Sequence, residues 1–222
     1  MSKPSLVLAS NSPRRRELLA LGGWSFDVRP ADVDERRMPG EAPASYVLRL
    51  AEAKARACAD SARKGSILVG ADTAVVDRDD ILGKPVDKAE AVEMLRRLSG
   101  RTHQVYTGIA ILRLADGKLA TDLCITDVPM RAYRADEIET YAASGDPLDK
   151  AGAYAIQHAG FHPVEKLAGC YASVMGLPLC HLTRSLRKLD IAPTIDISAE
   201  CQSALKYDCP VTAAILRGEM VG

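Results

Sequence analysis

The sequence predicts a mixed α/β domain, and three features of its pattern support this fold class. Strand-like apolar runs alternate with helical segments through the first half of the chain. The run Ile67–Val76 is almost continuously apolar, which is typical of a central strand buried on both faces. Asp116-Gly117 lies between two later strand-like segments and indicates a β-hairpin. Helices are therefore expected to flank a mixed sheet.

The chain begins with a short apolar strand from Leu6, a polar loop and a helix over Pro13–Leu21. Ser12 is suited to cap that helix, because its hydroxyl can accept a bond from a free backbone N–H. Arg14 and Arg15 follow at the helix start, where the N–H groups attract anions and guanidinium groups bind phosphate oxygens in pairs. This corner favours a polyphosphate site, although the local pattern alone fits a scaffold helix equally well.

A long helix over Ala44–Ala62 carries an informative misfit. Lys54 lies at helical spacing from Val47, Leu50 and Ala57, so it shares an otherwise apolar face. An ammonium group on such a face points either into a cleft that offers an anionic partner or along its own stem to water. The pattern leaves both alternatives open.

Asp72 interrupts the apolar strand Ile67–Val76. A carboxylate in a buried strand is destabilising unless it meets a cation, hydrogen-bond donors or a metal. The alternative is an aspartate that caps a turn, but the next turn residues come only at Asp77–Asp80. Asp72 is therefore the best candidate for chemistry in the chain.

Helix-capping residues, turn residues and the Gly and Pro residues that end helices and strands predict the remaining secondary structure. Asp87 and Glu90 form a capping box before one helix, and Gly145-Asp146-Pro147 breaks the chain. Residues 190–222 fit a packed arm, a short helix or partial disorder. The other expected elements are strands at Trp24–Val28, Arg101–Leu114 and Leu119–Ala132, helices at Lys88–Leu98, Ala135–Ser144 and Leu177–Leu189, loops at Ala31–Pro43 and Gly83–Pro85, and a loop entering a strand at Asp149–Gln157.

Composition excludes several functional classes. The 29 basic and 29 acidic residues cancel, so the chain lacks the strong field of a nucleic-acid binder. An aromatic content of 5% argues against a base-stacking surface. The sequence has neither a membrane-spanning apolar run nor a signal-peptide pattern, so we expect a cytoplasmic protein whose six cysteines are reduced.

The charged candidates together fit phosphoryl chemistry. Cations stabilise charge on a phosphoryl group, carboxylates hold a divalent ion beside phosphate oxygens, and a carboxylate can accept a proton from water. Neither a Walker loop nor a dinucleotide fingerprint is present, so side chains would grip the phosphates. The candidates are Arg14, Arg15, Lys54 and Lys84 for anion binding, with Glu35 and Asp72 for metal or base work.

Several segments, taken in order, resemble the Maf family of nucleotide pyrophosphatases. The similarity spans about residues 5–189, so we expect a catalytic domain over 1–189 and an extension of unknown role over 190–222. The segments that carry it are LASNSPRRRELL at 8–19, Val33–Glu35, Leu50–Ala55, Gly70–Thr73, Gly83–Pro85, Leu98–His103 and Asp149–Gln157.

The resemblance implies an α/β fold of two lobes around a deep cleft, with a mixed twisted sheet and flanking helices, similar to inosine triphosphate pyrophosphatases. It implies hydrolysis of a nucleoside triphosphate to the monophosphate and pyrophosphate with Mg²⁺ or Mn²⁺, in a homodimer that cleans the nucleotide pool. By resemblance, Asp72 is the proton acceptor, Glu35 and Asp72 hold the metal, and the phosphate-binding residues are Ser10, Arg14, Arg15, Lys54 and Lys84.

Three positions separate the branches of that family by base. Arg14, Thr73 and Gln157 resemble the dTTP/UTP branch, whereas the 7-methyl-GTP branch carries Trp, Gln and Glu there. An amide such as that of Gln157 can both donate and accept toward a pyrimidine edge. A 7-methyl-GTP pyrophosphatase, a nucleotidyltransferase and a non-catalytic nucleotide sensor that restrains cell division stay open as alternatives.

Overall fold

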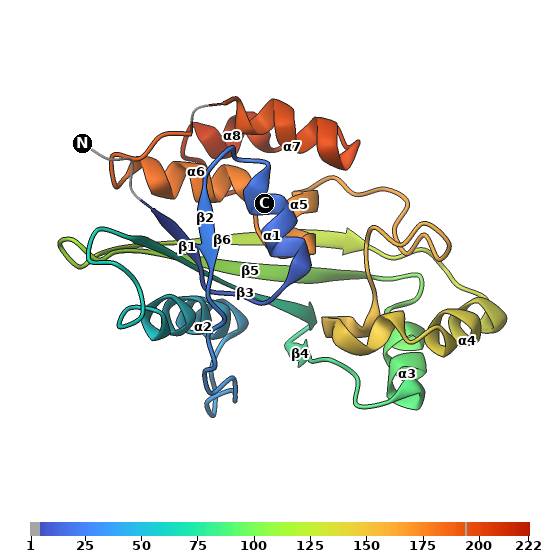
Figure 1. The fold of residues 1–222 in the computed structure, drawn as a ribbon. Helices are drawn as coiled ribbons and strands as arrows, with labels where there is room; N and C mark the ends of the chain where they lie inside the picture. Colours follow the sequence, from blue (N-terminus) through green and yellow to red (C-terminus); the bar gives the residue numbers. More distant parts are fainter. Residues whose placement is uncertain (1–4, 194) are drawn as a thin grey trace.

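A six-stranded mixed sheet forms the centre of the molecule in the computed structural model, which describes residues 5–193 and 195–222 (Figure 1). The strand order is β2-β1-β3-β5-β6, and β4 pairs with β3. β1 runs parallel to β2 and β3, whereas β3, β5 and β6 pair antiparallel, which confirms the predicted mixed α/β fold. The strands are β1 (Leu6–Leu8), β2 (Phe26–Val28), β3 (Ile67–Asp77), β4 (Asp80–Leu82), β5 (Thr102–Arg113) and β6 (Lys118–Pro129).

Helices cover both faces of this sheet. In Figure 1, α2 lies below the sheet, α1, α5 and α6 lie above it, and α7 and α8 form an outer layer over α6. The helices are α1 (Pro13–Ala20), α2 (Pro43–Ala57), α3 (Lys88–Leu98), α4 (Ala135–Ala143), α5 (Tyr171–Met175), α6 (Leu179–Arg187), α7 (Ile197–Leu205) and α8 (Thr212–Leu216), with 3₁₀ turns η1 (Asp146–Asp149) and η2 (Ala151–Ala153).

Separate apolar cores define the two expected lobes: the first lobe contains α1 and α6, and the second lobe contains α3 and α4. One core packs α1 and α6 on the sheet through side chains such as Leu8, Leu19 and Leu182. Another packs α3 and α4 against the far ends of β5 and β6 through Leu95 and Ile138. The long strands β3 and β5 contribute to both cores, so they hold the two lobes together.

The sheet opens along one side of β3. β1 pairs with β3 only over Ile67–Val69, and β4 pairs on the same side only over Val75–Asp77. Between them, residues 70–74 have no strand partner on that side within the described chain, while β5 pairs with the other side. Side chains from both faces of β3 therefore meet in one gap between the lobes.

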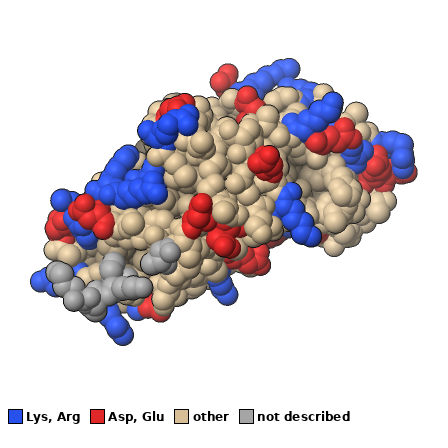
Figure 2. Space-filling model, turned by 90° about the horizontal axis from the view of Figure 1, so that it is seen from above, with Lys and Arg blue, Asp and Glu red and all other residues tan. Residues whose placement is uncertain are grey.

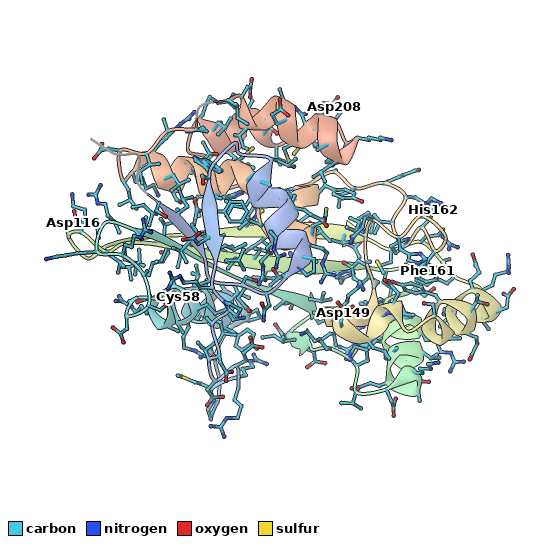
Figure 3. All side chains as sticks on the ribbon, in the orientation of Figure 1. Cys58, Asp116, Asp149, Phe161, His162 and Asp208 are labelled. Atoms are coloured by element: carbon cyan, nitrogen blue, oxygen red, sulfur yellow. The ribbon has the colours of Figure 1, made fainter. Side chains whose placement is uncertain are left out.

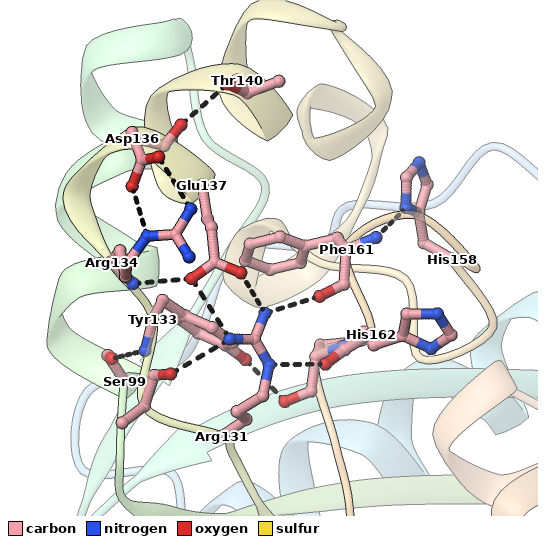
Figure 4. A network of polar contacts seen from close by, with 12 residues as sticks. Ser99, Arg131, Tyr133, Arg134, Asp136, Glu137, Thr140, His158, Phe161 and His162 are labelled. Atoms are coloured by element: carbon pink, nitrogen blue, oxygen red, sulfur yellow. Dashed lines mark hydrogen bonds and ion pairs between the residues drawn. The ribbon is translucent and has the colours of Figure 1, made fainter.

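A polar network joins separate segments of the second lobe (Figure 4). The Arg131 guanidinium donates to the carbonyls of Phe161 and His162 at 2.9 and 3.2 Å and pairs with Glu137 at 3.1 Å. The other oxygen of Glu137 accepts the backbone N–H of Arg134 at 2.8 Å, which satisfies a free donor at the start of α4. One arginine thus joins the end of β6, the start of α4 and the loop around 160.

Several predicted elements are corrected by the structure. α2 ends at Ala57 rather than Ala62, and Ala57 is exposed, because the sheet contacts the face that carries Ala51 and Ala55 instead. Among residues 150–193 and 195–222 no strand follows Asp149; the chain enters η2 instead, where Gly152 has a left-handed φ of 69°. Sequence reasoning also missed β4 and α5, which are only three and five residues long.

The last segment is a packed arm. Ile197 of α7 and Ile215 of α8 are buried, and Ile197 belongs to the core of the first lobe. Of the alternatives left open for this segment, packing as short helices is the one observed over residues 195–222.

On the face of the molecule shown in Figure 2, neither sign of charge dominates. Lys and Arg side chains alternate with Asp and Glu across the face shown in Figure 2, as the balanced composition predicts. Among the described residues, no helix is both long and apolar enough to span a bilayer.

Candidate active site

A cavity of about 590 Å³ fills the gap between the lobes, beside the open side of β3. Its walls come from the end of β1, the start of α1, α2, β3, the loop after β4 and the turns η1 and η2. All site residues predicted from the sequence line it: Ser10, Arg14, Arg15, Glu35, Lys54, Asp72, Thr73, Lys84 and Gln157.

Lys54 joins the two candidate carboxylates. Its Nζ lies 2.6 Å from Asp72 Oδ1 and 2.6 Å from Glu35 Oε1. Lys54 and Asp72 are 8% and 7% exposed, so the lysine points into the cavity and does not reach to bulk water. Of the two alternatives for Lys54, the anionic partner in a cleft is the one observed.

Two glycines explain why Lys54 reaches Asp72. Gly70 and Gly108 lie on the sheet face that α2 covers, and Gly108 pairs directly with Asp72. A Cβ on Gly70 would lie 2.0 Å from the Ala51 carbonyl oxygen, and one on Gly108 would lie 2.7 Å from the Val47 carbonyl. The absence of these side chains lets the α2 backbone rest on the strands.

The environments of the two carboxylates shift their pKa values in opposite directions. Burial raises the pKa of Asp72 above its ordinary value, although the charges of Lys54 and Arg15 oppose the rise. Desolvation acts in the same direction on Glu35, but the hydrogen bond and charge of Lys54, with Lys84 and Arg15 nearby, leave its pKa below the ordinary value. Such a pair is suited to one proton acceptor and one permanent anion.

Arg15 is held in place by three neighbours. Its Nε donates to the Gly176 carbonyl at 2.8 Å, Nη2 to Thr73 Oγ1 at 3.1 Å, and Nη1 to Ser10 Oγ at 3.4 Å. The Ser12 hydroxyl accepts the Arg15 backbone N–H at 3.4 Å, which confirms the predicted cap of α1. The guanidinium is therefore oriented before any anion arrives.

Arg14 spans the two lobes. Its Nη1 lies 3.7 Å from Asp149 at the end of η1, the residue labelled in Figure 3. Asp149 also accepts from Lys150 Nζ at 2.6 Å, and Lys150 is buried. The ion pair between Arg14 and Asp149 is long, and Lys150 also neutralises Asp149. Arg14 can therefore leave Asp149 to bind an anion of higher charge, such as a phosphate.

The carboxylate pair fits a divalent cation that shares a phosphate. Mg²⁺ is commonly bound through one or two carboxylates together with substrate phosphate oxygens. Glu35 and Asp72 offer such oxygens within reach of one Lys54 ammonium group. Within residues 5–193 and 195–222, no group of three or more His, Cys, Asp or Glu side chains could hold a metal. The donor set therefore fits a metal only together with a ligand that brings its own oxygens.

Sequence reasoning missed some residues that build the site. Tyr46 donates its hydroxyl to the Glu35 carbonyl at 2.9 Å and so fixes the loop that carries Glu35. Thr107 lies 3.0 Å from Thr73, and Gly176 supplies the carbonyl for Arg15. Only the pairing of strands could have placed Thr107 here, because it belongs to an ordinary strand-like run.

The chain matches a family model and curated relatives over most of its length. The family model described as "Maf-like protein" matches residues 5–189. A dTTP/UTP pyrophosphatase of Geobacter sulfurreducens is 50% identical over 190 residues, which cover 85% of this chain and 98% of that protein. A dTTP/UTP pyrophosphatase of Anaeromyxobacter dehalogenans strain 2CP-C is 48% identical over 187 residues, covering 83% of this chain and 94% of that protein.

Among solved structures, the Ham1 protein of Staphylococcus aureus aligns with a TM-score of 0.39 and 14% identity over 72% of this chain and 91% of that chain. The dITP/XTP pyrophosphatase of Mycobacterium abscessus aligns with a TM-score of 0.35 and 15% identity over 57% and 74% of the two chains.

Proposed function

We propose that this chain, which belongs to the Maf-like protein family, hydrolyses nucleoside triphosphates, above all dTTP and UTP, to the monophosphate and pyrophosphate. The printed activity of its relatives supports the substrate class. The observation that carries the proposal is the Lys54 ammonium group, which joins Asp72 and Glu35 in a cavity that arginines and a second lysine also line.

The reaction we propose is an attack of water on the α-phosphorus. Asp72 accepts the proton while the new bond from oxygen to phosphorus forms. The bond from the α-phosphorus to the bridging oxygen breaks, and pyrophosphate leaves with the electron pair. Burial suits Asp72 to this role, because its raised pKa makes it a stronger base than a surface aspartate.

The remaining side chains bind and orient the phosphates. Arg14, Arg15 and Lys84 neutralise the departing pyrophosphate, and Ser10 holds one arm of Arg15 in position. A Mg²⁺ or Mn²⁺ ion held by Glu35 and Asp72 would supply further neutralisation of phosphate oxygens. Thr73 and Gln157 line the same cavity and are the proposed contacts for the base.

The direct test is a screen for pyrophosphate release. Purified protein is incubated with dTTP, UTP, CTP, ATP, GTP and 7-methyl-GTP, each with EDTA, Mg²⁺ or Mn²⁺. We expect kcat/KM to be highest for dTTP and UTP and turnover to require the metal. In H₂¹⁸O, the label should enter the monophosphate and not the pyrophosphate.

Other outcomes decide between the alternatives. A best rate with 7-methyl-GTP would show that Arg14, Thr73 and Gln157 do not select the base as proposed. Binding of nucleotide without hydrolysis would favour a sensor, and a requirement for a second substrate would favour a transferase. The proposed setting is a cytoplasmic homodimer, which cell fractionation and light scattering would check.

A further inference from the structure

A line of hydrogen bonds runs from the cavity into the core. Arg15 Nη2 donates to Thr73 Oγ1 at 3.1 Å, Thr73 Oγ1 lies 3.0 Å from Thr107 Oγ1, and Thr107 Oγ1 donates to the Ser173 carbonyl at 2.9 Å. Thr107 and Ser173 are fully buried, whereas Thr73 lines the cavity. A wall residue of the site is therefore connected to groups that no ligand touches.

The fold fixes this line in place. Thr73 and Thr107 are direct partners in the antiparallel pair of β3 and β5, so their side chains share one face of the sheet. Ser173 belongs to α5, which packs on that face, and its carbonyl also accepts the Gly176 N–H at 2.9 Å. A rotation of either threonine would break a bond that has no replacement in a buried setting.

Only one arrangement of the two hydroxyl protons satisfies all three hydrogen bonds along this line. A carbonyl cannot donate, so the Thr107 proton must point to Ser173. The bond between the threonines then needs the Thr73 proton, which therefore points to Thr107 and away from the cavity. The reverse order would leave two oxygens facing each other at 2.9 Å without a proton between them.

The donors of Arg15 limit what remains on Thr73. A guanidinium has five N–H groups, and three of those on Arg15 go to Gly176, Thr73 and Ser10. The N–H that reaches Thr73 takes one of the two lone pairs of its hydroxyl oxygen. Thr73 can therefore offer a ligand one lone pair and no proton.

We infer that Thr107 is a positioning residue that turns Thr73 into a pure acceptor, so that the site selects pyrimidines with a ring N–H over pyrimidines without one. Uracil and thymine carry a proton on N3, whereas cytosine carries a lone pair there. The inference rests on the proposed function and goes beyond it, because it explains how one hydroxyl distinguishes UTP from CTP. A mismatch of this kind is worth about 1–3 kcal/mol, or roughly five- to 150-fold in kcat/KM.

The test compares Thr107→Val and Thr107→Ser with the wild type. The valine has nearly the same shape but cannot accept the Thr73 proton, which then becomes free to turn toward the cavity. We expect Thr107→Val to lower the ratio of kcat/KM for UTP over CTP by about tenfold or more. Thr107→Ser keeps the hydroxyl and should restore most of that ratio.

A matched control separates this effect from a general loss of packing. Thr183 of α6 is also fully buried, and its hydroxyl has no partner in the part of the chain that is described. Thr183→Val makes the same chemical change outside the cavity and should leave the UTP to CTP ratio unchanged. Thermal unfolding of each variant shows whether it is folded at the assay temperature.

Two results would overturn the inference. The first is a Thr107→Val variant that slows UTP and CTP equally. The second is a serine variant that behaves like the valine variant, since the hydroxyl would then be irrelevant. Calorimetric binding of UMP and CMP supplies a readout that needs no turnover. If the wild type hydrolyses neither triphosphate, the proposed function fails, while the ratio of UMP to CMP affinity still decides the role of Thr107.

Discussion

At the scale of single residues, the two acids of the site differ in their electrostatic environment. Both carboxylates contact the same ammonium group, yet burial raises the pKa of Asp72 and the cations around Glu35 lower the pKa of that residue. A group that binds a proton readily and a group that stays charged are the two parts that water activation beside a metal needs. We therefore propose that Asp72 accepts the proton from water and that Glu35 stays negatively charged throughout.

The assignment predicts a large effect for Asp72→Asn. The amide keeps the shape of the side chain but accepts a proton far less readily, so kcat should fall by about a hundredfold or more. The KM for the nucleotide should change much less, because the arginines and Lys84 remain. Steady-state kinetics on UTP checks both values, with the exposed Asp60→Asn as control. Near-normal kcat in Asp72→Asn would remove Asp72 from the mechanism.

Because His103 is buried, we expect the protein to lose stability in acid. Burial lowers its pKa to about 4, and its Nε2 lies 2.9 Å from the Tyr154 hydroxyl. Because the pKa of His103 is lower in the folded state than in the unfolded state, its protonation favours unfolding. The neutral histidine therefore makes its full contribution to the free energy of unfolding above about pH 6.5, the usual pKa of histidine, and this contribution is lost as the pH falls toward 4. Over that window the free energy of unfolding should drop by about 3 kcal/mol from His103 alone.

Urea unfolding at several pH values measures this contribution. The carboxylates are common to the wild type and His103→Gln, so the difference between the two proteins reports the histidine together with its coupling to Asp77. The wild type should lose more stability than the variant between pH 6.5 and 4. Parallel curves for the two proteins would show that His103 is protonated as easily in the folded state as in the unfolded one.

At the scale of elements, the site depends on how closely α2 approaches β3 and β5. The helix backbone rests on Gly70 and Gly108, and this contact sets the depth at which Lys54 enters the cavity. A small outward shift of α2 would move Lys54 away from Asp72, and the short charge-assisted hydrogen bond between them would weaken.

Gly108→Ala tests this contact. The new methyl group would lie 2.7 Å from the Val47 carbonyl, so α2 must move outward at a loss of about 1–3 kcal/mol in stability. Lys54 would move with the helix, and kcat should fall although no cavity residue has changed. Gly65→Ala is the control, since its Cβ meets nothing within 4 Å. Chemical unfolding and UTP kinetics report the two effects, and unchanged values for Gly108→Ala would contradict the account.

The elements also show what the sequence could and could not predict. Asp72 and Lys54 stood out because each breaks an apolar pattern, and the structure brings them together. Thr107 breaks no pattern, since a threonine is common in a strand, and only the register of β3 against β5 gives it a role. β4 and α5 were missed because three to five residues are too few for a periodic signal.

At the scale of the whole molecule, one buried arginine of α6 helps to hold the segment after Asp190 against the first lobe. Arg184 makes two bonds to Asp122, at 2.5 and 2.6 Å, and a third nitrogen donates to the carbonyls of Glu219 and Ile215. The same side chain therefore balances a buried carboxylate of β6 and holds the last turn of the chain.

We propose that residues 190–222 stabilise the first lobe without taking part in the reaction. The family match ends at residue 189, and the cavity has no lining residue from this segment among those described. Besides the carbonyls that Arg184 binds, the segment contributes apolar burial, with Ile197 and Ile215 at 2% and 0% exposure. Each such side chain is worth about 1.5–3 kcal/mol when fully buried.

Deletion of residues 190–222 should then lower the stability of the protein and leave its activity nearly unchanged. Loss of at least 3 kcal/mol would lower the melting temperature by roughly 10 °C in a chain of this size. At temperatures well below melting, kcat/KM for UTP should stay within about twofold, because a distant change that leaves the cavity intact removes no transition-state contact. Glu219→Ala in the full chain is the matched control, since it removes only a surface pair with Arg217 and keeps the carbonyl that Arg184 binds. A truncated protein that is folded but inactive would place this segment in the catalytic machinery, and one that melts like the full chain would show that its packing is dispensable.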